Sequence, residues 1–295
     1  MTAPVDNLLH QLSLEQTGAF RFRAPPVTDD RNRLFGGQLI GQSLAAASRT
    51  TELGLAHSLH AYFLRGGRTQ EPIGITVEPL RDGRSYCTRR VSMHQGGEHI
   101  FELTASFHIE ETGHEHQRAV PTDLPSPDDC QPWAEFIRPA ISHFPEGQQK
   151  RILAPRAIEF RPIDPIDFAT GEPRTTRQRY WIRSNSPLPN DACMNQWVVA
   201  YCSDRALLDT NLRPHGTTLW AENITGASLD HAVWFHRQTS LDRWHLYDLQ
   251  SDWTGGARGL ARGYLYDPDG HLVASVCQEG MIRVLDDSLP KSEAR

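Results

Sequence analysis

Two polar residues interrupt segments that are otherwise apolar, and each could take part in acid–base chemistry. One face of a predicted helix is formed by residues at helical spacing, of which only Asp204 is polar: Cys193, Trp197, Ala200, Asp204 and Leu207. A carboxylate on a buried face is costly unless it is paired or neutral. Asp204 is therefore either a functional acid or base, or a cap in which Ser203 and Asp204 precede a new helix that begins at Arg205.

The last predicted strand also has one polar residue on its apolar face. Residues of one parity are apolar except for Gln278: Leu272, Ala274, Val276, Gln278, Gly280 and Ile282. A buried glutamine has up to four hydrogen bonds to satisfy. Gln278 is therefore either a site residue, a satisfied core amide, or a residue near a strand end that faces solvent.

A third segment, residues 228–237, predicts a strand that is polar on both faces. Ser228, Asp230 and His236 share one parity, whereas His231 and Arg237 share the other. The segment could be a catalytic strand, an interface strand, or an edge strand protected by charge. An extended strand would direct His231 and His236 to opposite faces, which argues against a shared metal site.

Length and composition exclude several classes of protein. The chain has 295 residues and a formal net charge of −6, so it lacks the overall basic charge of a nucleic-acid-binding protein. Its longest apolar runs, such as residues 197–202, are far shorter than the roughly 20 residues of a membrane span. The N-terminus shows no secretory leader, and residues 291–295 do not form a peroxisomal signal. The five scattered cysteines form no C-x-x-C, so we predict a cytoplasmic protein with no membrane span.

The absence of familiar motifs narrows the reaction class. The sequence contains no G-x-S-x-G nucleophile elbow, no G-x-G-x-x-G after a strand, no H-E-x-x-H and no P-loop. An α/β serine hydrolase, a dinucleotide-binding fold, a zinc protease and a P-loop nucleotidase are therefore disfavoured.

The elements that must position these residues form a duplicated unit. Twelve of the 20 prolines lie between residues 121 and 189, and residues 110–155 predict a long connection with one short helix near 133–141. His114 and His116 in this connection are expected to be solvated. Four pairs of segments follow one another in the same order on the two sides: 19–26 with 157–164, 58–65 with 228–237, 81–86 with 255–259, and 94–101 with 267–273.

Each unit predicts a short strand, one long helix and an antiparallel meander. The helices are predicted at 35–50 and about 192–209, and hairpin turns at Asp82-Gly83, Gly96-Gly97 and Asp269-Gly270. The first helix is rich in glycine and alanine, which allows a sheet to approach closely. We predict an α+β fold in which each antiparallel sheet wraps around one helix, with domains at 1–115 and 155–295 and a linker at 116–154.

Six segments of the sequence resemble the acyl-CoA thioesterase II family. They are RLFGGQLIGQ at 33–42, HSLHAYFLR at 57–65, LRDGRSY at 80–86, YCSD at 201–204, SLDHAVWFHR at 228–237 and QEG at 278–280. The resemblance extends from about residue 16 to residue 283. It implies a double hotdog fold, two helix-in-sheet units fused in one chain, and hydrolysis of fatty acyl-CoA to fatty acid and CoA.

The resemblance also implies a catalytic site. The family's Asp, its Thr or Ser, and its Gln hold a water molecule, and they match Asp204, Ser228 and Gln278. Asp204 would act as general base while Ser228 and Gln278 orient the water, without a covalent acyl-enzyme. His57 is a candidate support or substrate contact. Gly36 and Gly37 begin a helix at which a carbonyl could approach backbone N–H groups.

Further expectations concern ligands and partners. The acyl chain needs an apolar tunnel, expected between the two halves, and the CoA phosphates need basic residues, for which the candidates are Arg65, Arg84, Arg258 and Arg262. No metal or redox cofactor is implied, and CoA enters only as part of the substrate. Hotdog sheets commonly pair edge to edge, so a homodimer or higher homo-oligomer is expected.

Two alternatives to hydrolysis remain open. One is a hotdog hydratase or dehydratase that acts on enoyl-CoA through a pair formed by Asp230 and His236. The other is an acyl-CoA binding or sensor protein without catalysis.

Overall fold

The computed structural model describes residues 4–27, 33–144, 146–164, 166 and 171–285. Its first half contains helices α1 (Pro4–Leu12) and α2 (Gly36–Ser48). Six strands complete this half: β1 (Glu15–Gly18), β2 (Arg21–Ala24), β3 (Leu55–Phe63), β4 (Ile73–Asp82), β5 (Tyr86–Gln95) and β6 (Glu98–His108).

The connection and the second half follow. The connection contains η1 (Pro127–Asp129), α3 (Trp133–Ile137), η2 (Arg138–His143) and α4 (Glu146–Ile152). The second half contains the helices α5 (Ala192–Ser203), α6 (Leu207–Thr210) and η3 (Arg213–His215). Its strands are β7 (Ile158–Pro162), β8 (Arg177–Ser184), β9 (Ile224–Ser228), β10 (Asp230–Phe235), β11 (His245–Gly255), β12 (Arg258–Tyr266) and β13 (Leu272–Val284).

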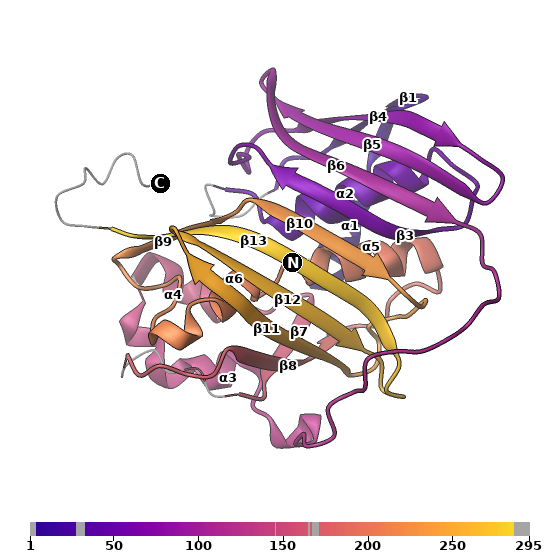
Figure 1. The fold of residues 1–295 in the computed structure, drawn as a ribbon. Coiled ribbons are helices and arrows are strands. Elements are labelled where there is room, and N and C mark those ends of the chain that lie inside the picture. Colours follow the sequence, from indigo (N-terminus) through magenta and orange to yellow (C-terminus); the bar gives the residue numbers. More distant parts are fainter. Residues whose placement is uncertain (1–3, 28–32, 145, 165, 167–170, 286–295) are drawn as a thin grey trace.

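All the described strands belong to one antiparallel sheet of thirteen strands (Figure 1). The order is β1-β2-β4-β5-β6-β3-β10-β13-β12-β11-β8-β7, and β9 pairs with β13 outside this path. The run β2-β4-β5-β6-β3 mirrors β8-β11-β12-β13-β10, so the predicted duplication is present in the topology. The two wrapped sheets are therefore the halves of a single sheet, and the α+β double hotdog prediction is confirmed at the level of architecture.

Three of the four predicted segment pairs fall on equivalent elements, and the first pair is wrong. Residues 19–26 contain β2, whereas residues 157–164 contain β7, which corresponds to β1. Both segments are short alternations of aromatic or aliphatic residues with arginine. Such a pattern identifies a strand but not its place in the sheet.

Strand β10 joins the two halves, with β3 on one side and β13 on the other (Figure 1). Its central residue Ala232 lies opposite His60 of β3 and Cys277 of β13. The interpretation of residues 228–237 as an edge strand is therefore wrong. Both edges of β10 are hydrogen-bonded, and its polar side chains lie at the junction of the two units.

Helix α2 is enclosed, as its small residues predict. Every residue from Gly37 to Ala47 is buried. A Cβ atom added to Gly41 would lie 2.9 Å from Leu12 Cδ2 and 3.2 Å from the carbonyl oxygen of Trp197. Glycine at this position allows α1 and α5 to pack directly against the α2 backbone, and one hydrophobic core extends through both halves.

The second long helix is shorter than predicted. Helix α5 ends at Ser203, Asp204 is its C-cap, and Ala206 adopts a left-handed conformation with φ of 70° before α6 begins. The predicted continuous helix to residue 209 is therefore wrong. The alternative in which Ser203 and Asp204 cap the next helix is wrong too, because Ala206 occupies that N-cap position and no side chain caps α6.

The connection between the halves lies along the second half (Figure 1). The side chain of Gln117 donates to the carbonyl oxygen of Gly270 at 2.8 Å, and the Trp181 indole donates to that of Pro125 at 3.0 Å. The short helix predicted near 133–141 is present as α3 and η2, and both His114 and His116 are exposed as expected.

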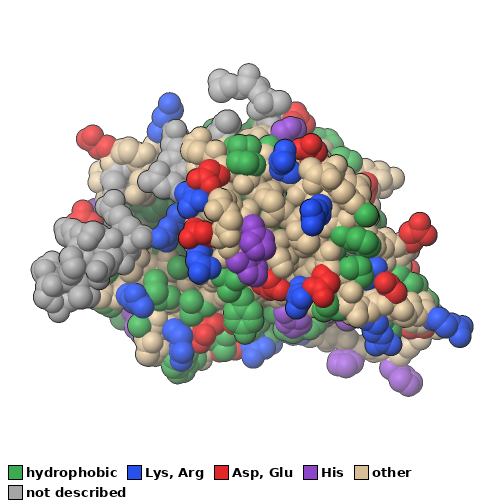
Figure 2. Space-filling view, turned by 90° about the horizontal axis from the view of Figure 1, so that it is seen from above, with side chains coloured by type: hydrophobic (Ala, Val, Ile, Leu, Met, Phe, Trp, Pro, Cys, Tyr) green, Lys and Arg blue, Asp and Glu red, His purple; other side chains and the backbone are tan. Residues whose placement is uncertain are grey.

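The surface mixes charges of both signs. On the face shown in Figure 2, basic and acidic side chains are interspersed, with one small cluster of histidine atoms near the centre and other histidines toward the edges. Among the helices of the described ranges, none combines the length and apolar character that crossing a membrane would need.

Candidate active site

Asp204 reaches across from the second half to the start of α2. Its Oδ2 atom accepts a hydrogen bond of 2.8 Å from the backbone N–H of Gly37. Phe35 at the N-cap of α2 supplies no capping side chain. The first turn of a helix has N–H groups that need an acceptor, and its positive end favours a carboxylate. Asp204 therefore caps a helix that is distant in the sequence.

Gly36 and Gly37 make this approach sterically feasible. A Cβ atom at position 36 would lie 2.7 Å from Asp204 Oδ2 and 2.8 Å from a ring carbon of Phe63. At position 37 it would lie only 2.1 Å from the carbonyl oxygen of Tyr201. The two glycines therefore allow the N-terminus of α2 to contact the C-terminus of α5.

Two strands bring an amide and a hydroxyl to the same carboxylate. Gln278 on β13 is 1% exposed, and its Nε2 atom donates a hydrogen bond to Ser228 Oγ at the end of β9. The register of β9 against β13, with Ser228 opposite Gly280, sets this contact. The structure thus brings together Asp204, Ser228, Gln278, Gly36 and Gly37.

The surroundings of Asp204 suit a base that works near neutrality. Burial raises its pKa to about 7, while the Gly37 N–H, the Gln278 side chain, Arg205 and Ser228 each act in the opposite direction. The residue is only partly buried, but its Oδ1 atom is inaccessible to solvent and has no partner within hydrogen-bond distance among the described residues. Oδ1 is therefore an acceptor available to a proton donor.

His231 completes the polar cluster, and the sequence reasoning did not assign it to the site. The side chain is 1% exposed, with Nδ1 at 3.1 Å from Gln278 Oε1 and Nε2 at 2.8 Å from Ser203 Oγ. Burial lowers its pKa to about 4, although the contact with Gln278 raises it. The imidazole is therefore neutral at physiological pH. The sequence offered one indication of this role: His231 lies on the same predicted strand as Ser228, although on its opposite face.

His57 lies apart from this cluster. Its Nε2 atom is 2.8 Å from Ser106 Oγ, and its ring packs against those of Tyr86 and His108. His57 stands six residues before Phe63, the residue of β3 that approaches Gly36, and an extended strand places them about 20 Å apart. The structure gives His57 no contact with the carboxylate, the amide or the hydroxyl.

Asp230 and His236 do not form a pair. Asp230 Oδ1 accepts from the backbone N–H of Glu279 at 2.8 Å, whereas His236 Nε2 lies 2.9 Å from Ser275 Oγ. Asp230 begins β10 and His236 follows its last residue, so strand geometry separates them by about 20 Å.

The four arginine candidates for the CoA phosphates occupy different places. Arg84 lies in the turn between β4 and β5, at the same end of the sheet as the start of β3 and so away from Phe63. Arg258 is paired with Glu279 at 3.2 Å and Arg262 with Asp252 at 2.5 Å. Arg65 is exposed two residues beyond Phe63 and donates to the carbonyl oxygen of His99. Position therefore favours Arg65 and Arg258 over Arg84.

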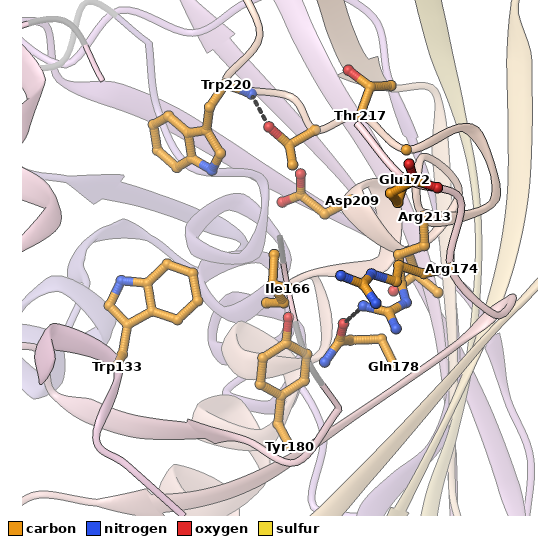
Figure 3. Close-up of a pocket in the computed structure, with 13 residues that line it drawn as sticks. Trp133, Ile166, Glu172, Arg174, Gln178, Tyr180, Asp209, Arg213, Thr217 and Trp220 are labelled. Carbon is orange, nitrogen blue, oxygen red and sulfur yellow. Dashed lines mark hydrogen bonds between the residues drawn. The ribbon is translucent and has the colours of Figure 1, made fainter. Parts of the chain in front are cut away.

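A cavity with aromatic walls lies beside Asp209, between Trp133, Tyr180 and Trp220 (Figure 3). Two adjoining pockets of about 500 and 400 Å³, partly open to solvent, share Trp133, Tyr180, Asp209 and Trp220. The smaller pocket is also lined by Arg205 and Ala206, the residues that follow Asp204. Burial raises the pKa of Asp209, which accepts a backbone hydrogen bond from Leu219. The cavity offers apolar ring surfaces beside Arg205 and Ala206, the residues that follow Asp204 in the chain.

The described residues contain no cluster of metal-ligating side chains. Within the part of the chain that the structure describes, no three His, Cys, Asp or Glu side chains lie close enough together to hold a metal ion.

Comparisons with known proteins identify the family. Residues 164–281 match the family model described as acyl-CoA thioesterase, and residues 24–108 match that of the acyl-CoA thioesterase N-terminal domain. The chain is 34% identical to acyl-CoA thioesterase 2 of Haemophilus influenzae over 284 residues, which cover 96% of this chain and 99% of the relative.

Solved structures give the same result. A crystal structure of acyl-CoA thioesterase II TesB2 from Mycobacterium marinum is 37% identical with a TM-score of 0.76, covering 94% of this chain and 98% of that one. A hot dog protein from Alicyclobacillus acidocaldarius is 20% identical with a TM-score of 0.74, covering 97% and 100% of the two chains, and supports the fold alone. Sequence and fold together place this chain in the acyl-CoA thioesterase II family.

Proposed function

We propose that the protein hydrolyses fatty acyl-CoA to a free fatty acid and CoA, with Asp204 as the general base for a water molecule. The observation on which the proposal rests is the carboxylate itself. It has a pKa of about 7, it is anchored through Oδ2 by Gly37, and its Oδ1 has an unused acceptor position beside Ser228 and Gln278. Family membership and the aromatic cavity beside Arg205 support an acyl thioester as the substrate.

The proposed reaction proceeds in one addition and one elimination. Water gives a proton to Asp204 Oδ1 while its oxygen attacks the thioester carbonyl carbon. The tetrahedral intermediate then expels the CoA thiolate as the C–S bond breaks, and the thiolate takes the proton from Asp204, which leaves the fatty acid, CoA thiol and a carboxylate ready for the next cycle. Gln278 and Ser228 orient the water, so part of the rate gain is positional. The Gly37 N–H, expected as an oxyanion donor, donates to Asp204 instead and holds the base in place.

The proposed mechanism needs no metal or redox cofactor, and CoA takes part only as a portion of the substrate. A homodimer or higher homo-oligomer and a cytoplasmic location remain predictions from the sequence.

The function is tested by measuring CoA thiol release from a panel of saturated acyl-CoAs of increasing chain length. The protein has five cysteines of its own, so enzyme without substrate provides the background for the thiol reagent. Turnover on at least one chain length is expected. A folded protein that binds acyl-CoA without releasing CoA would favour the sensor alternative, and water addition to enoyl-CoA without CoA release would favour a hydratase.

The rate is expected to depend on pH through Asp204. Burial raises its pKa to about 7, and only the deprotonated form can accept a proton from water. The value of kcat/KM should therefore level off above pH 7 and fall about tenfold per pH unit well below it. Loss of thioester absorbance measures this without dependence on thiol ionisation. A profile that stays flat down to pH 5 would rule out Asp204 as the base.

Ser228 is expected to orient the water rather than attack the substrate. Its oxygen accepts a hydrogen bond from the Gln278 amide, so one lone pair of that oxygen is not available for attack on a carbonyl carbon. We expect Ser228→Ala to lower kcat about tenfold, and Ser228→Thr, which keeps the hydroxyl, to retain most of the activity. Loss of a covalent nucleophile would cost far more, on the order of 10⁶-fold in a triad enzyme. Steady-state kinetics of both variants separate the two roles.

A further inference from the structure

A chain of buried hydrogen bonds connects α5 to the proposed water site. It runs from Ser203, the residue before Asp204, to His231 on β10, then to Gln278 on β13 and finally to Ser228 on β9. Ser203, His231 and Gln278 are 4%, 1% and 1% exposed. The start of the chain is also held in place, because the Tyr247 hydroxyl donates to the backbone oxygen of Ser203 at 2.5 Å.

The positions of the heavy atoms allow two directions for this chain. Ser203 Oγ lies 2.8 Å from the carbonyl oxygen of Ala200 and 2.8 Å from His231 Nε2. A hydroxyl has one proton to donate. If the Ser203 hydroxyl donates to Ala200, the proton of the neutral His231 ring is on Nε2 and is donated to Ser203. Nδ1 is then an acceptor, and the amide nitrogen of Gln278 must face it. If the Ser203 hydroxyl instead donates to His231 Nε2, the proton of the neutral ring is on Nδ1, and Nδ1–H donates to Gln278 Oε1.

The carboxylate of Asp204 decides between these directions. In the first case the carbonyl oxygen of Gln278 would face the Asp204 carboxylate, and two hydrogen-bond acceptors would lie together with no proton between them. In the second case the amide NH₂ group faces them and stabilises the carboxylate, which is the direction in which Gln278 acts on the Asp204 pKa. The observed contacts, Nε2 to Ser228 and Oε1 to His231, correspond to the second case.

We propose that His231, as the neutral Nδ1–H tautomer, is a positioning residue that holds the Gln278 amide with its NH₂ group toward Ser228 and Asp204. The proposal deepens the function proposed above and rests on it for its kinetic part. His231 itself is separated from the water site by the amide. Its contribution is to select one of the two amide orientations, which differ by a half-turn and have nearly the same shape.

The tautomer can be tested without any substrate. Nitrogen-15 NMR of the histidine-labelled protein, with His231→Asn used to assign the signal, reports which ring nitrogen is protonated. The expected spectrum at pH 7 shows a neutral ring with the proton on Nδ1. A proton on Nε2, or a charged ring, would overturn the proposal whether or not the protein is a thioesterase.

Kinetics test whether His231 acts through Gln278. His231→Leu keeps the volume but removes the donor, whereas the side-chain amide of His231→Asn can present a donor near the Nδ1 position. We expect His231→Leu to lower kcat by 10-fold to about 10²-fold with little change in KM, and His231→Asn to recover part of the loss. The decisive comparison is with Gln278→Ala, in whose background His231→Leu should have no further effect on kcat. Losses that multiply would show that His231 acts independently of Gln278 and would overturn the proposal.

The two proposals fail in distinguishable ways. Absence of turnover by the wild-type protein contradicts the proposed function and leaves the NMR result to decide the orientation of the amide. Turnover by the wild-type protein together with an Nε2–H tautomer contradicts the role of His231 alone.

Discussion

Asp204→Asn is expected to lower kcat by about 10² to 10⁴-fold while the protein remains folded. The asparagine oxygen can still accept the hydrogen bond from Gly37, so the N-terminus of α2 keeps its cap. It cannot take a proton from water, so only the chemical step is lost. Acyl-CoA hydrolysis by the two proteins, at equal concentration and on the best chain length, measures the ratio. Equal turnover would show that the carboxylate is structural.

Asp230→Asn provides the matched control. Asp230 is also a partly buried aspartate on the second half, burial raises its pKa, and it accepts a backbone hydrogen bond from Glu279 at 2.8 Å. The same chemical change at this position should leave kcat within a few-fold of the wild type. A loss as large as that of Asp204→Asn would show that the effect is not specific to the carboxylate of Asp204.

The same substitution of Asp204 is expected to stabilise the fold at alkaline pH. The pKa of Asp204 is about 7 in the folded protein against an ordinary value of 3.8, so the native state binds a proton that the unfolded state has released. Stability therefore falls as pH rises through this window, and the cost is complete above pH 7. At about 1.4 kcal/mol per unit, Asn should gain about 4 kcal/mol at most at pH 8 and little at pH 4. Denaturant unfolding at both pH values measures this difference, and an equal gain at both would contradict the assigned cause.

Gly37→Ala is expected to damage both stability and activity. Alanine normally favours a helix over glycine by about 1 kcal/mol. Here the new methyl group would lie 2.1 Å from the carbonyl oxygen of Tyr201, a backbone atom that cannot rotate away. Separating α2 from α5 should cost roughly 1–3 kcal/mol or more and should pull the Gly37 N–H away from Asp204, lowering kcat as well.

Gly147→Ala is the control for helix propensity. Gly147 belongs to α4, and a Cβ atom there would meet nothing within 4 Å. This variant should be neutral or slightly more stable, opposite in sign to Gly37→Ala. Denaturant midpoints and kcat of both variants test the pair. A midpoint for Gly37→Ala at or above that of the wild type would show that the helix contact is not tightly constrained.

Local patterns in the sequence were sufficient for much of the architecture. The small residues of 35–50 predicted an enclosed helix, and glycine-containing turns marked the hairpins between β4 and β5, β5 and β6, and β12 and β13. These features depend on residues close together in the chain. A polar residue on an apolar face, at Asp204 and at Gln278, was likewise visible as an exception to a local period.

The roles of those two exceptions needed more than the pattern. The residues alone left Asp204 as either a functional group or a cap, and Gln278 as either a site residue or a core amide. The family resemblance favoured the functional interpretation of both residues and added Ser228. The structure then placed Asp204, Ser228 and Gln278 in one cluster. His57 was a candidate from the same resemblance, but the structure places it apart from this cluster, next to Ser106.

The sequence by itself determined the duplicated helix-in-sheet unit, the family and the three candidate groups, because these depend on short-range periodicity and on motif identity. Tertiary structure alone decided that α5 stops at Ser203, that β10 joins both halves, and that His231 contacts the Gln278 amide. Each of these depends on packing between segments that are distant in the chain. The N-terminus of α2 in the first half has no local side-chain cap. The carboxylate of Asp204 in the second half, 167 residues away, supplies that cap by accepting a hydrogen bond from Gly37.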